Sequence, residues 1–299
     1  MILITGASGY IGSHLVQRLV AMNERPRCLV RRASAIGGLP ASAVDVVYGD
    51  ITDPGSLRAA LTGVDRVVHL AAVTANIKET AQVSYHKINV QGTRNLIEAA
   101  RAAGVARVVM LSGIGAQPGA EGSWIRTRWE GEEVVRHGGV PYTIIQPSVL
   151  FGGKRAEFFA AQARVLRQSP VAPILGNGRF KFQPIWVEDV CTCILKALDD
   201  PALTDTTVAV GGPEIFTYEG LLDLIMDTMG KRKPKVRAPL GLMRLNAAVA
   251  QALLPRPPIT TATIDLFNLG DNITDLDAVA KHFGFQPRSL RDDLRENGV

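Results

Sequence analysis

The sequence is poor in cysteine and has no long apolar run, and both shortages narrow what the protein can be. Its only three cysteines are Cys28, Cys191 and Cys193, too few for a secreted disulfide scaffold. A single residue separates Cys191 from Cys193, which is not zinc-ligand spacing, so we predict no metal site. The chain contains no run of about 18 apolar residues, so we predict no membrane-spanning helix. The chain opens as a strand rather than a signal peptide, so we expect a cytoplasmic protein.

The apolar residues that are present follow an alternating strand and helix rhythm. The hydrophobic content is 46% over 299 residues, enough for a sizeable core. The predicted strands are Met1–Thr5, Arg27–Val30, Val44–Tyr48, Arg66–Leu70, Arg107–Leu111, Tyr142–Gln146 and Thr207–Val210. The predicted helices are Tyr10–Met22, Ser56–Thr62, Thr93–Ala103, Ser123–His137 and Glu157–Arg167. Strands so uniformly apolar are typical of a parallel sheet covered on both faces.

The rhythm changes after about Gly211, which predicts a second region. Helical patterns with little strand signal occupy the tail, at Tyr218–Met229, Leu240–Leu254, Thr260–Leu269 and Leu276–Phe283. We therefore predict an α/β protein with a Rossmann-type doubly wound parallel sheet and a smaller, mostly helical C-terminal lobe. The sheet domain is expected at residues 1–150, with 184–211 returning to it, and the smaller lobe at 151–183 and 212–299.

A glycine-rich turn directly follows the first predicted strand. Gly6, Gly9 and Gly12 have the spacing G-x-x-G-x-x-G, and an apolar helical stripe continues after them. Gly6 permits a tight turn, Gly9 a close approach of a pyrophosphate, and Gly12 close packing of the helix on the strand. The helix N-terminus then directs amide groups at an anion. We predict a dinucleotide site here, which also includes Ser8, Tyr10 and Ile11.

The end of the second predicted strand points to a particular dinucleotide. A protein that prefers NAD usually has an acidic residue there, whereas this chain has Arg31 and Arg32. A guanidinium pairs with a 2′-phosphate, so we predict NADP(H) rather than NAD(H), although two solvated loop arginines would give the same pattern. Asp50 with Ile51, after the third strand, is expected beside the adenine. Ala71 and Ala72, after the fourth, are small enough to let the cofactor pass.

Several segments together resemble the extended or atypical short-chain dehydrogenase/reductases. They are TGASGYIG (5–12), LVRR (29–32), GDITD (49–53), HLAA (69–72) and INVQGTRNLIEAA (88–100). Residues 142–152 resemble the sixth strand and Pro-containing cofactor loop of that superfamily, which implies that Pro147 and Val149 contact the cofactor. Residues 183–190 resemble its P-V-H-V-D-D-V segment. The tail, at 255–260, 269–272 and 283–285, is similar to bacterial relatives of the NADPH-binding accessory subunit of respiratory complex I.

The resemblance fails at the catalytic residues. Catalytic members use Tyr-x-x-x-Lys, but none of the five tyrosines has a lysine four residues later. Trp124 and Arg128 occupy the matching positions on one helical face. An indole does not exchange its proton near neutral pH, whereas a guanidinium still binds ribose or phosphate. We therefore expect cofactor binding, with Arg128 taking part, to survive more readily than catalysis.

The other positions of the catalytic motif are also depleted. Ser112 keeps one hydroxyl of the serine region, and Asn89 matches an asparagine that organises a water and the lysine in relatives. Without that lysine, Asn89 could equally tie two elements together. The groups near enough in sequence to substitute are Tyr85, His86, Lys87 and Arg126, with His86 expected in a partly exposed loop. The catalytic residues therefore stay unassigned.

Positive charge is concentrated in one part of the tail. Residues 230–256 carry seven basic residues and no acidic one, while the whole chain has a net charge of only +5. The segment 240–254 is apolar enough for a packed helix or for one at a membrane interface. A core helix beside a solvated basic loop is the favoured interpretation. The alternative is a protein complex or a membrane surface, which would place the protein at the periphery of the inner membrane. No nucleic-acid partner is expected, because aromatic residues do not interleave the charges.

Three functions remain open at this point. The leading hypothesis is an NADP(H)-binding protein in which the dinucleotide is structural or sensory. The first rival is an NADPH-dependent reductase or epimerase acting on a small-molecule substrate, either a nucleotide sugar, a quinone precursor or an isoprenoid-like compound. The second rival is a redox sensor that binds a protein partner differently with NADPH and NADP⁺.

Overall fold

The computed structural model describes residues 1–34, 36, 38–81, 83–153, 156–255, 257 and 259–298. These residues form two compact units. The first unit contains residues 1–74, 79–146 and 191–208, and the second contains residues 75–78, 147–190 and 209–299. The sequence predicts that the sheet domain runs to residue 150 and that the chain returns to it at residue 184. In the structure the chain leaves the first unit after Gln146 and returns to it at Cys191.

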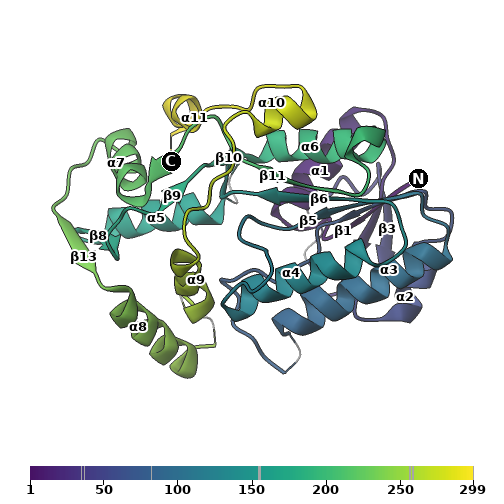
Figure 1. Ribbon diagram of the computed structural model, residues 1–299, viewed down its shortest axis with the longest axis horizontal. Helices are drawn as coiled ribbons and strands as arrows, with labels where there is room; N and C mark the ends of the chain where they lie inside the picture. Colours follow the sequence, from purple (N-terminus) through teal and green to yellow (C-terminus); the bar gives the residue numbers. More distant parts are fainter. Residues whose placement is uncertain are drawn as a thin grey trace. The chain divides into compact units, whose positions relative to one another are not determined.

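The first unit is built on a seven-stranded sheet with the order β11-β6-β5-β4-β1-β2-β3 (Figure 1). All pairs from β6 through β3 are parallel. The order reverses beside β1, which is the doubly wound arrangement. The strands are β1 Ile2–Thr5, β2 Arg27–Val30, β3 Asp45–Tyr48, β4 Arg66–His69, β5 Arg107–Leu111, β6 Tyr142–Pro147 and β11 Thr206–Val210. Every residue of β1 and β5 is buried, as their continuous apolar sequences predict.

Helices cover both faces of this sheet. In Figure 1, α3 and α4 lie along one face, and α1 and α6 along the other. The helical elements are α1 Tyr10–Ala21, α2 Pro54–Ala60, a π-helical turn at His86–Gly92 that continues into α3 Thr93–Ala102, α4 Ser123–Arg136, α6 Val187–Asp199 and a 3₁₀ turn at Pro201–Leu203. Asp53 caps α2 by accepting from the Gly55 amide at 2.9 Å, so α2 begins before the predicted Ser56. The predicted fold class is confirmed.

The second unit combines helices with short strand pairs. Strand β7 Leu150–Phe151 pairs with β10 Ile185–Trp186, β8 Ala172–Leu175 with β13 Lys235–Ala238, and β9 Lys181–Phe182 with β12 Phe216–Thr217. The rings of Phe182, Tyr218 and Phe267 pack edge to face at the centre, with centroids 5.5–6.3 Å apart. The helices are α5 Glu157–Gln168, α7 Tyr218–Thr228, α8 Leu240–Leu253, α9 Thr261–Asp265, a 3₁₀ turn at Leu266–Asn268, α10 Ala278–Phe283 and α11 Leu290–Asn297.

Three expectations for the tail and its flanks are corrected. Lys235–Ala238 is a strand rather than part of a loop, because it pairs in parallel with β8. Its side chains are mostly exposed, so the sequence shows no apolar strand pattern there. Helices α6 and α11 were not predicted. Residues 240–254 do form a helix, but not the expected core helix, because Ala247 is the one residue of α8 that is fully buried. Arg256, counted in the basic segment, lies outside the described residues.

Candidate functional site: a dinucleotide cradle without its usual acid

The turn between β1 and α1 has the geometry of an anion cradle. Gly6 adopts φ +71°, a left-handed conformation that favours glycine. Its carbonyl accepts from the Gly9 amide at 2.9 Å, and the Gly9 carbonyl accepts from Ser13 at 3.0 Å. Helix α1 then begins at Tyr10, so the amides of its first turn, which include Ile11, emerge from the cradle. Ser8 is half-buried within the same turn.

The three glycines have different reasons to be glycine. A Cβ on Gly6 would lie 2.8 Å from the Ala71 nitrogen, and one on Gly12 would lie 2.8 Å from the Ala7 Cα and closer still to the Gly6 carbonyl oxygen. These two glycines let the backbone close on itself. A Cβ on Gly9 would meet only the Gly6 oxygen, at 3.0 Å. Among the described residues, no atom other than this oxygen and those of the adjacent residues lies within 4 Å of that position, which fits the close approach of a pyrophosphate.

The two arginines after β2 are placed differently. Both are exposed, and the Arg32 guanidinium carbon lies 5.1 Å from the centre of the Tyr48 ring at the end of β3. No residue in the described part of the chain forms an ion pair with Arg31. Arg31 thus keeps its planar donor group available, and Arg32 is stacked.

The loop after β3 is ordered by its own side chains. Asp50 accepts at Oδ1 from the amide and the hydroxyl of Thr52, both at 2.8 Å, which fixes the carboxylate. Ile51 is buried, and its carbonyl accepts from Asn95 at 3.0 Å. Contact of Asp50 and Ile51 with an adenine stays a prediction.

A buried histidine, which the sequence reasoning did not single out, connects the ends of β1 and β4. Thr93 donates its hydroxyl proton to the Asn89 carbonyl at 2.7 Å, so it accepts from His69 Nε2 at 3.0 Å. His69 Nδ1 then accepts from Thr5 at 2.8 Å, and Thr5 accepts from the Ala71 amide at 3.2 Å. Burial, together with the positive charge of Arg128, lowers the pKa of His69 to about 3, so the imidazole stays neutral.

This chain of hydrogen bonds holds the β4 loop, including Ala71 and the adjacent half-buried Ala72, against the β1 turn. The signal was present in the sequence: Thr5 and His69 are polar residues at the ends of apolar strands. They lie opposite each other because β1 and β4 are neighbours in this register. The order of the strands, and not either strand alone, makes the pair.

The replaced catalytic positions are tied to the backbone. The Trp124 indole N–H donates to the Val73 carbonyl at 2.8 Å. Arg128 is 5% exposed and donates through Nη2 to the Leu111 carbonyl. Burial lowers the pKa of Arg128 to about 10, and the negative charge of buried Glu132 opposes that shift. Arg128 therefore lies at the end of β5, and its contact with a cofactor stays a prediction.

Asn89 ties elements together with its whole side-chain amide. Its Oδ1 accepts from the Val73 amide at 2.9 Å, and its Nδ2 donates to Thr127 at 3.1 Å and to the Val73 carbonyl at 3.3 Å. It sits in the π-helical turn, a distortion that often marks a functional site. Of the two roles considered for Asn89, organising a water or tying two elements together, these hydrogen bonds match the second.

Ser112 has the opposite character. Its Oγ atom is buried, yet no hydrogen-bond partner for it exists in the described part of the molecule. A buried hydroxyl without a hydrogen-bond partner in the protein is costly, and a ligand or water that binds there would satisfy it. Ser112 follows Leu111 at the carboxyl end of β5, the edge at which Rossmann folds bind nicotinamide dinucleotides. The open space over Gly9 and the unpaired Ser112 hydroxyl both fit such a cofactor.

The remaining candidates differ in their burial and in the unit to which they belong. Tyr85 is buried, and burial next to Glu79 raises its pKa to about 12. Lys87 and Arg126 are exposed. His86 is exposed but begins the π-helical turn, so the expected loop position is wrong. Pro147 and Val149 belong to the second unit, where Val149 donates its amide to Asn272 Oδ1 at 3.2 Å and accepts from Ile185 at 3.0 Å.

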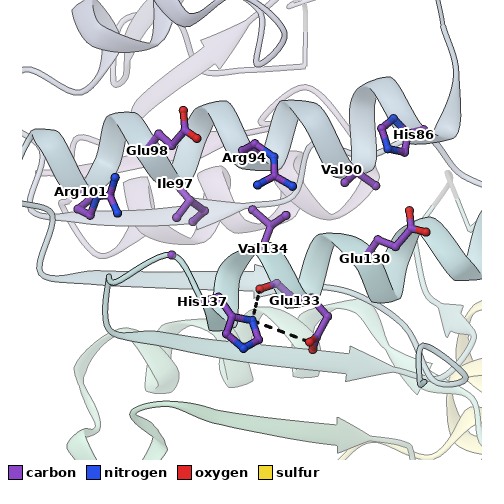
Figure 2. Close-up of a pocket in the computed structure, with 11 residues that line it drawn as sticks. His86, Val90, Arg94, Ile97, Glu98, Arg101, Glu130, Glu133, Val134 and His137 are labelled. Carbon is purple, nitrogen blue, oxygen red and sulfur yellow. Dashed lines mark hydrogen bonds and ion pairs between the residues drawn. The ribbon is translucent and has the colours of Figure 1, made fainter. Parts of the chain in front are cut away.

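A groove of about 570 Å³ runs between the α3 side and α4 (Figure 2). None of the predicted cofactor residues lines it. His137 Nδ1 lies 2.9 Å from the Glu133 carbonyl oxygen and 3.9 Å from Glu133 Oε2, the contacts dashed in Figure 2. The lining residues are His86, Val90, Arg94, Ile97, Glu98, Arg101, Glu130, Glu133, Val134, His137 and Gly138.

Fold and cradle together define a Rossmann protein that binds a nicotinamide dinucleotide. The chain belongs to the NAD(P)H-binding family, whose sequence pattern it matches over residues 6–201. Within the described residues, no group of three or more histidine, cysteine or acidic side chains is arranged to hold a metal ion. Over the same residues, no helix has both the length and the apolarity to cross a membrane.

Relatives of known name extend over nearly the whole chain. Sterol demethylase protein B of Methylococcus capsulatus is 30% identical over 327 residues, covering 97% of this chain and 94% of the relative. Ceramide reductase of Caulobacter vibrioides is 28% identical, covering 90% and 82%. The mitochondrial NADH dehydrogenase [ubiquinone] 1 alpha subcomplex subunit 9 of Arabidopsis thaliana is 25% identical, covering 89% and 67%. The predicted resemblance to the complex I accessory subunit is confirmed.

Solved structures agree on the fold. The UDP-glucose 4-epimerase of Thermotoga maritima superposes with a TM-score of 0.77 at 21% identity, covering 98% of this chain and 96% of that one. At this identity the likeness concerns the fold alone.

Proposed function

We propose that this protein binds NADP(H) in the β1–α1 cradle and keeps it as a structural or sensory ligand. A bound nicotinamide gives or takes a hydride, but carbonyl reduction also needs a proton donor. The observation that carries the proposal is the hydrogen bond of Trp124, whose only polar side-chain hydrogen is donated to the Val73 carbonyl at 2.8 Å. An indole in that position positions the loop after β4 and transfers no proton.

The neighbouring groups support the same reading. Asn89 spends its amide on Val73 and Thr127, so it has no donor left to organise a water. Arg128 remains cationic at neutral pH, because even its lowered pKa is about 10. Its charge can hold a negatively charged or carbonyl oxygen, while its Nη2 group already donates to the Leu111 carbonyl.

The preference for NADP(H) over NAD(H) rests on Arg31. Its guanidinium follows β2, where a ribose 2′-substituent arrives in Rossmann proteins, and no described residue competes for it. Arg32, stacked on Tyr48, adds positive charge to the same strand end. A carboxylate, which would favour NAD(H), is absent from residues 31 and 32.

Ser112 favours a second candidate, reduction of an apolar lipid-like substrate with NADPH. The buried Ser112 hydroxyl is available to bind a substrate oxygen. Two relatives that cover most of the chain are named sterol demethylase protein B and ceramide reductase, and both names refer to lipids. This candidate requires a proton donor other than Trp124.

Turnover on a carbonyl panel separates the two candidates. The native protein is mixed with NADPH and with ketosteroids, long-chain keto lipids, quinones or nucleotide sugars, and nicotinamide absorbance is followed. We expect stoichiometric binding with almost no oxidation, since general acid catalysis contributes about 10²–10⁴-fold. A kcat/KM of about 10⁴ M⁻¹s⁻¹ or more on any member would refute the ligand-only role.

A restored motif tests the geometry behind this proposal. The double variant Trp124→Tyr with Arg128→Lys returns the acid and the lysine to one helical face. We expect it to gain turnover on part of the panel. The matched control, Trp124→Phe with Arg128→Lys, supplies no hydroxyl and should gain none. Equal activity of both doubles would show that position 124 does not face the reacting carbonyl.

A further inference from the structure

Helix α8 exposes a stripe of large aliphatic side chains on one face. Leu242, Leu245, Val249 and Leu253 are spaced by three, four and four residues, which places them on one side of the helix. They are 54%, 61%, 50% and 75% exposed. We call these four residues the outer face of α8. Contiguous exposed apolar surface of this kind marks an interaction site.

The opposite face of α8 holds the helix in place. Ala247 is buried, and Leu240 and Met243 pack against the aromatic core of the second unit. Figure 1 shows α9 beside α8, and Arg244 joins the two through Asp265, whose carboxylate lies 2.8 Å away.

The C-terminal end of α8 is anchored as well. Lys78 donates to the carbonyls of Gln251 and Leu254, placing a cation where the helix dipole favours one. Gln251 in turn accepts from the Thr261 amide at 2.7 Å. Because both its inner face and its C-terminal end are attached to the second unit, α8 is a packed helix whose outer face is nevertheless exposed.

The chain segment that leads into and forms α8 carries charged residues of one sign only. No acidic residue occurs from Gly230 to Ile264. Lys235 is neutralised by Glu219 and Asp223 at 2.9 and 2.8 Å. Lys231 and Arg232 are exposed, and no ion pair to either exists in the described part of the chain. They precede β13, and β13 leads directly into the N-terminus of α8, so two unpaired cationic groups stand in the chain segment that enters the helix.

We propose that α8 and the basic segment 231–237 dock reversibly on an anionic phospholipid bilayer. The outer face would lie in the bilayer plane among the upper acyl carbons, while Lys231 and Arg232 contact lipid phosphates. An aliphatic face that follows unpaired cations along the chain matches the two chemistries of an anionic bilayer, acyl chains and phosphates, and this match favours a lipid surface over a protein partner. The proposal does not depend on what the dinucleotide does.

Vesicle cosedimentation of the whole protein tests this docking. Vesicles of phosphatidylcholine and phosphatidylglycerol in equal parts are compared with pure phosphatidylcholine. We expect about tenfold or stronger binding to the anionic vesicles, falling as salt rises. The variant Leu245→Glu with Val249→Glu should weaken binding by about tenfold or more, because it places charges among acyl chains.

A matched control and an oligomer measurement make the test decisive. Leu276→Glu changes an equally exposed leucine, at 54%, outside α8 and should bind vesicles like the native protein. NADPH binding and circular dichroism verify that each variant is folded. The proposal is overturned if native protein ignores anionic vesicles or if the double variant binds them equally well. Sedimentation velocity showing an oligomer that the double variant abolishes, without vesicle binding, would assign the outer face to a second copy of the chain.

Discussion

Gly9 and Gly12 lie in the same turn but fail differently when a side chain is added. For Gly12→Ala, the new Cβ lies 2.8 and 2.9 Å from the Ala7 Cα and carbonyl carbon, and closer still to the Gly6 oxygen. All three are backbone atoms, so α1 must move away from β1. For Gly9→Val, the Cβ meets only the Gly6 oxygen at 3.0 Å, and the extended backbone at Gly9, φ −72° and ψ 179°, suits a branched residue.

The magnitudes follow from these contacts. Overpacking costs about 1–3 kcal/mol, and Gly12→Ala belongs at the upper end because backbone cannot rotate away. Alanine regains about 1 kcal/mol of helix propensity, which leaves a loss of about 2 kcal/mol. That corresponds to a fall in Tm of roughly 4–8 °C. Gly9→Val replaces an N-cap glycine at a cost of about 1 kcal/mol, while its methyl groups fill the space for a pyrophosphate.

Thermal denaturation and titration calorimetry separate the two effects. We expect Gly12→Ala to lose mainly stability. Gly9→Val should keep most of its Tm and lose NADPH affinity by about a hundredfold or more. A folded Gly9→Val protein with native NADPH affinity would remove the cradle from the dinucleotide site. A Gly12→Ala protein with native Tm would show that α1 does not need this close approach.

Two further predictions concern Arg31 and His69. Arg31→Ala should weaken NADPH binding by about ten- to a hundredfold, because a charge-assisted hydrogen bond contributes about 1.5–3 kcal/mol, and NADH binding should change little. Equal calorimetric affinities of the native protein for NADPH and NADH would contradict this prediction. The folded pKa of His69, about 3, lies below its ordinary 6.5, so the unfolded chain binds the proton first as pH falls. His69 stabilisation is therefore complete above pH 6.5 and should shrink by about 2 kcal/mol at pH 5. Urea unfolding of the native protein and His69→Gln measures this difference, and parallel pH profiles would refute it.

The sequence alone determined the architecture of the sheet and the position of the cradle. Strands as short and apolar as Arg107–Leu111 have few alternatives to a parallel sheet buried on both faces. Gly6, Gly9 and Gly12 act through the backbone conformation of seven consecutive residues, and such a local motif can be predicted from the sequence. The absence of Tyr-x-x-x-Lys was equally plain. Such features depend on neighbours in sequence.

The roles of the polar groups around the cradle follow from long-range packing and could not be predicted from local sequence. Trp124 reaches Val73, and His69 joins Thr5 to Thr93, across 51, 64 and 24 residues. No pattern within one element specifies such partners, because they depend on strand order and helix packing. The orientation of α8 was hidden for the same reason. An apolar helix has the same kind of sequence whether its leucines face a core or solvent. The contacts of Leu240, Met243 and Ala247 show which side of α8 is buried.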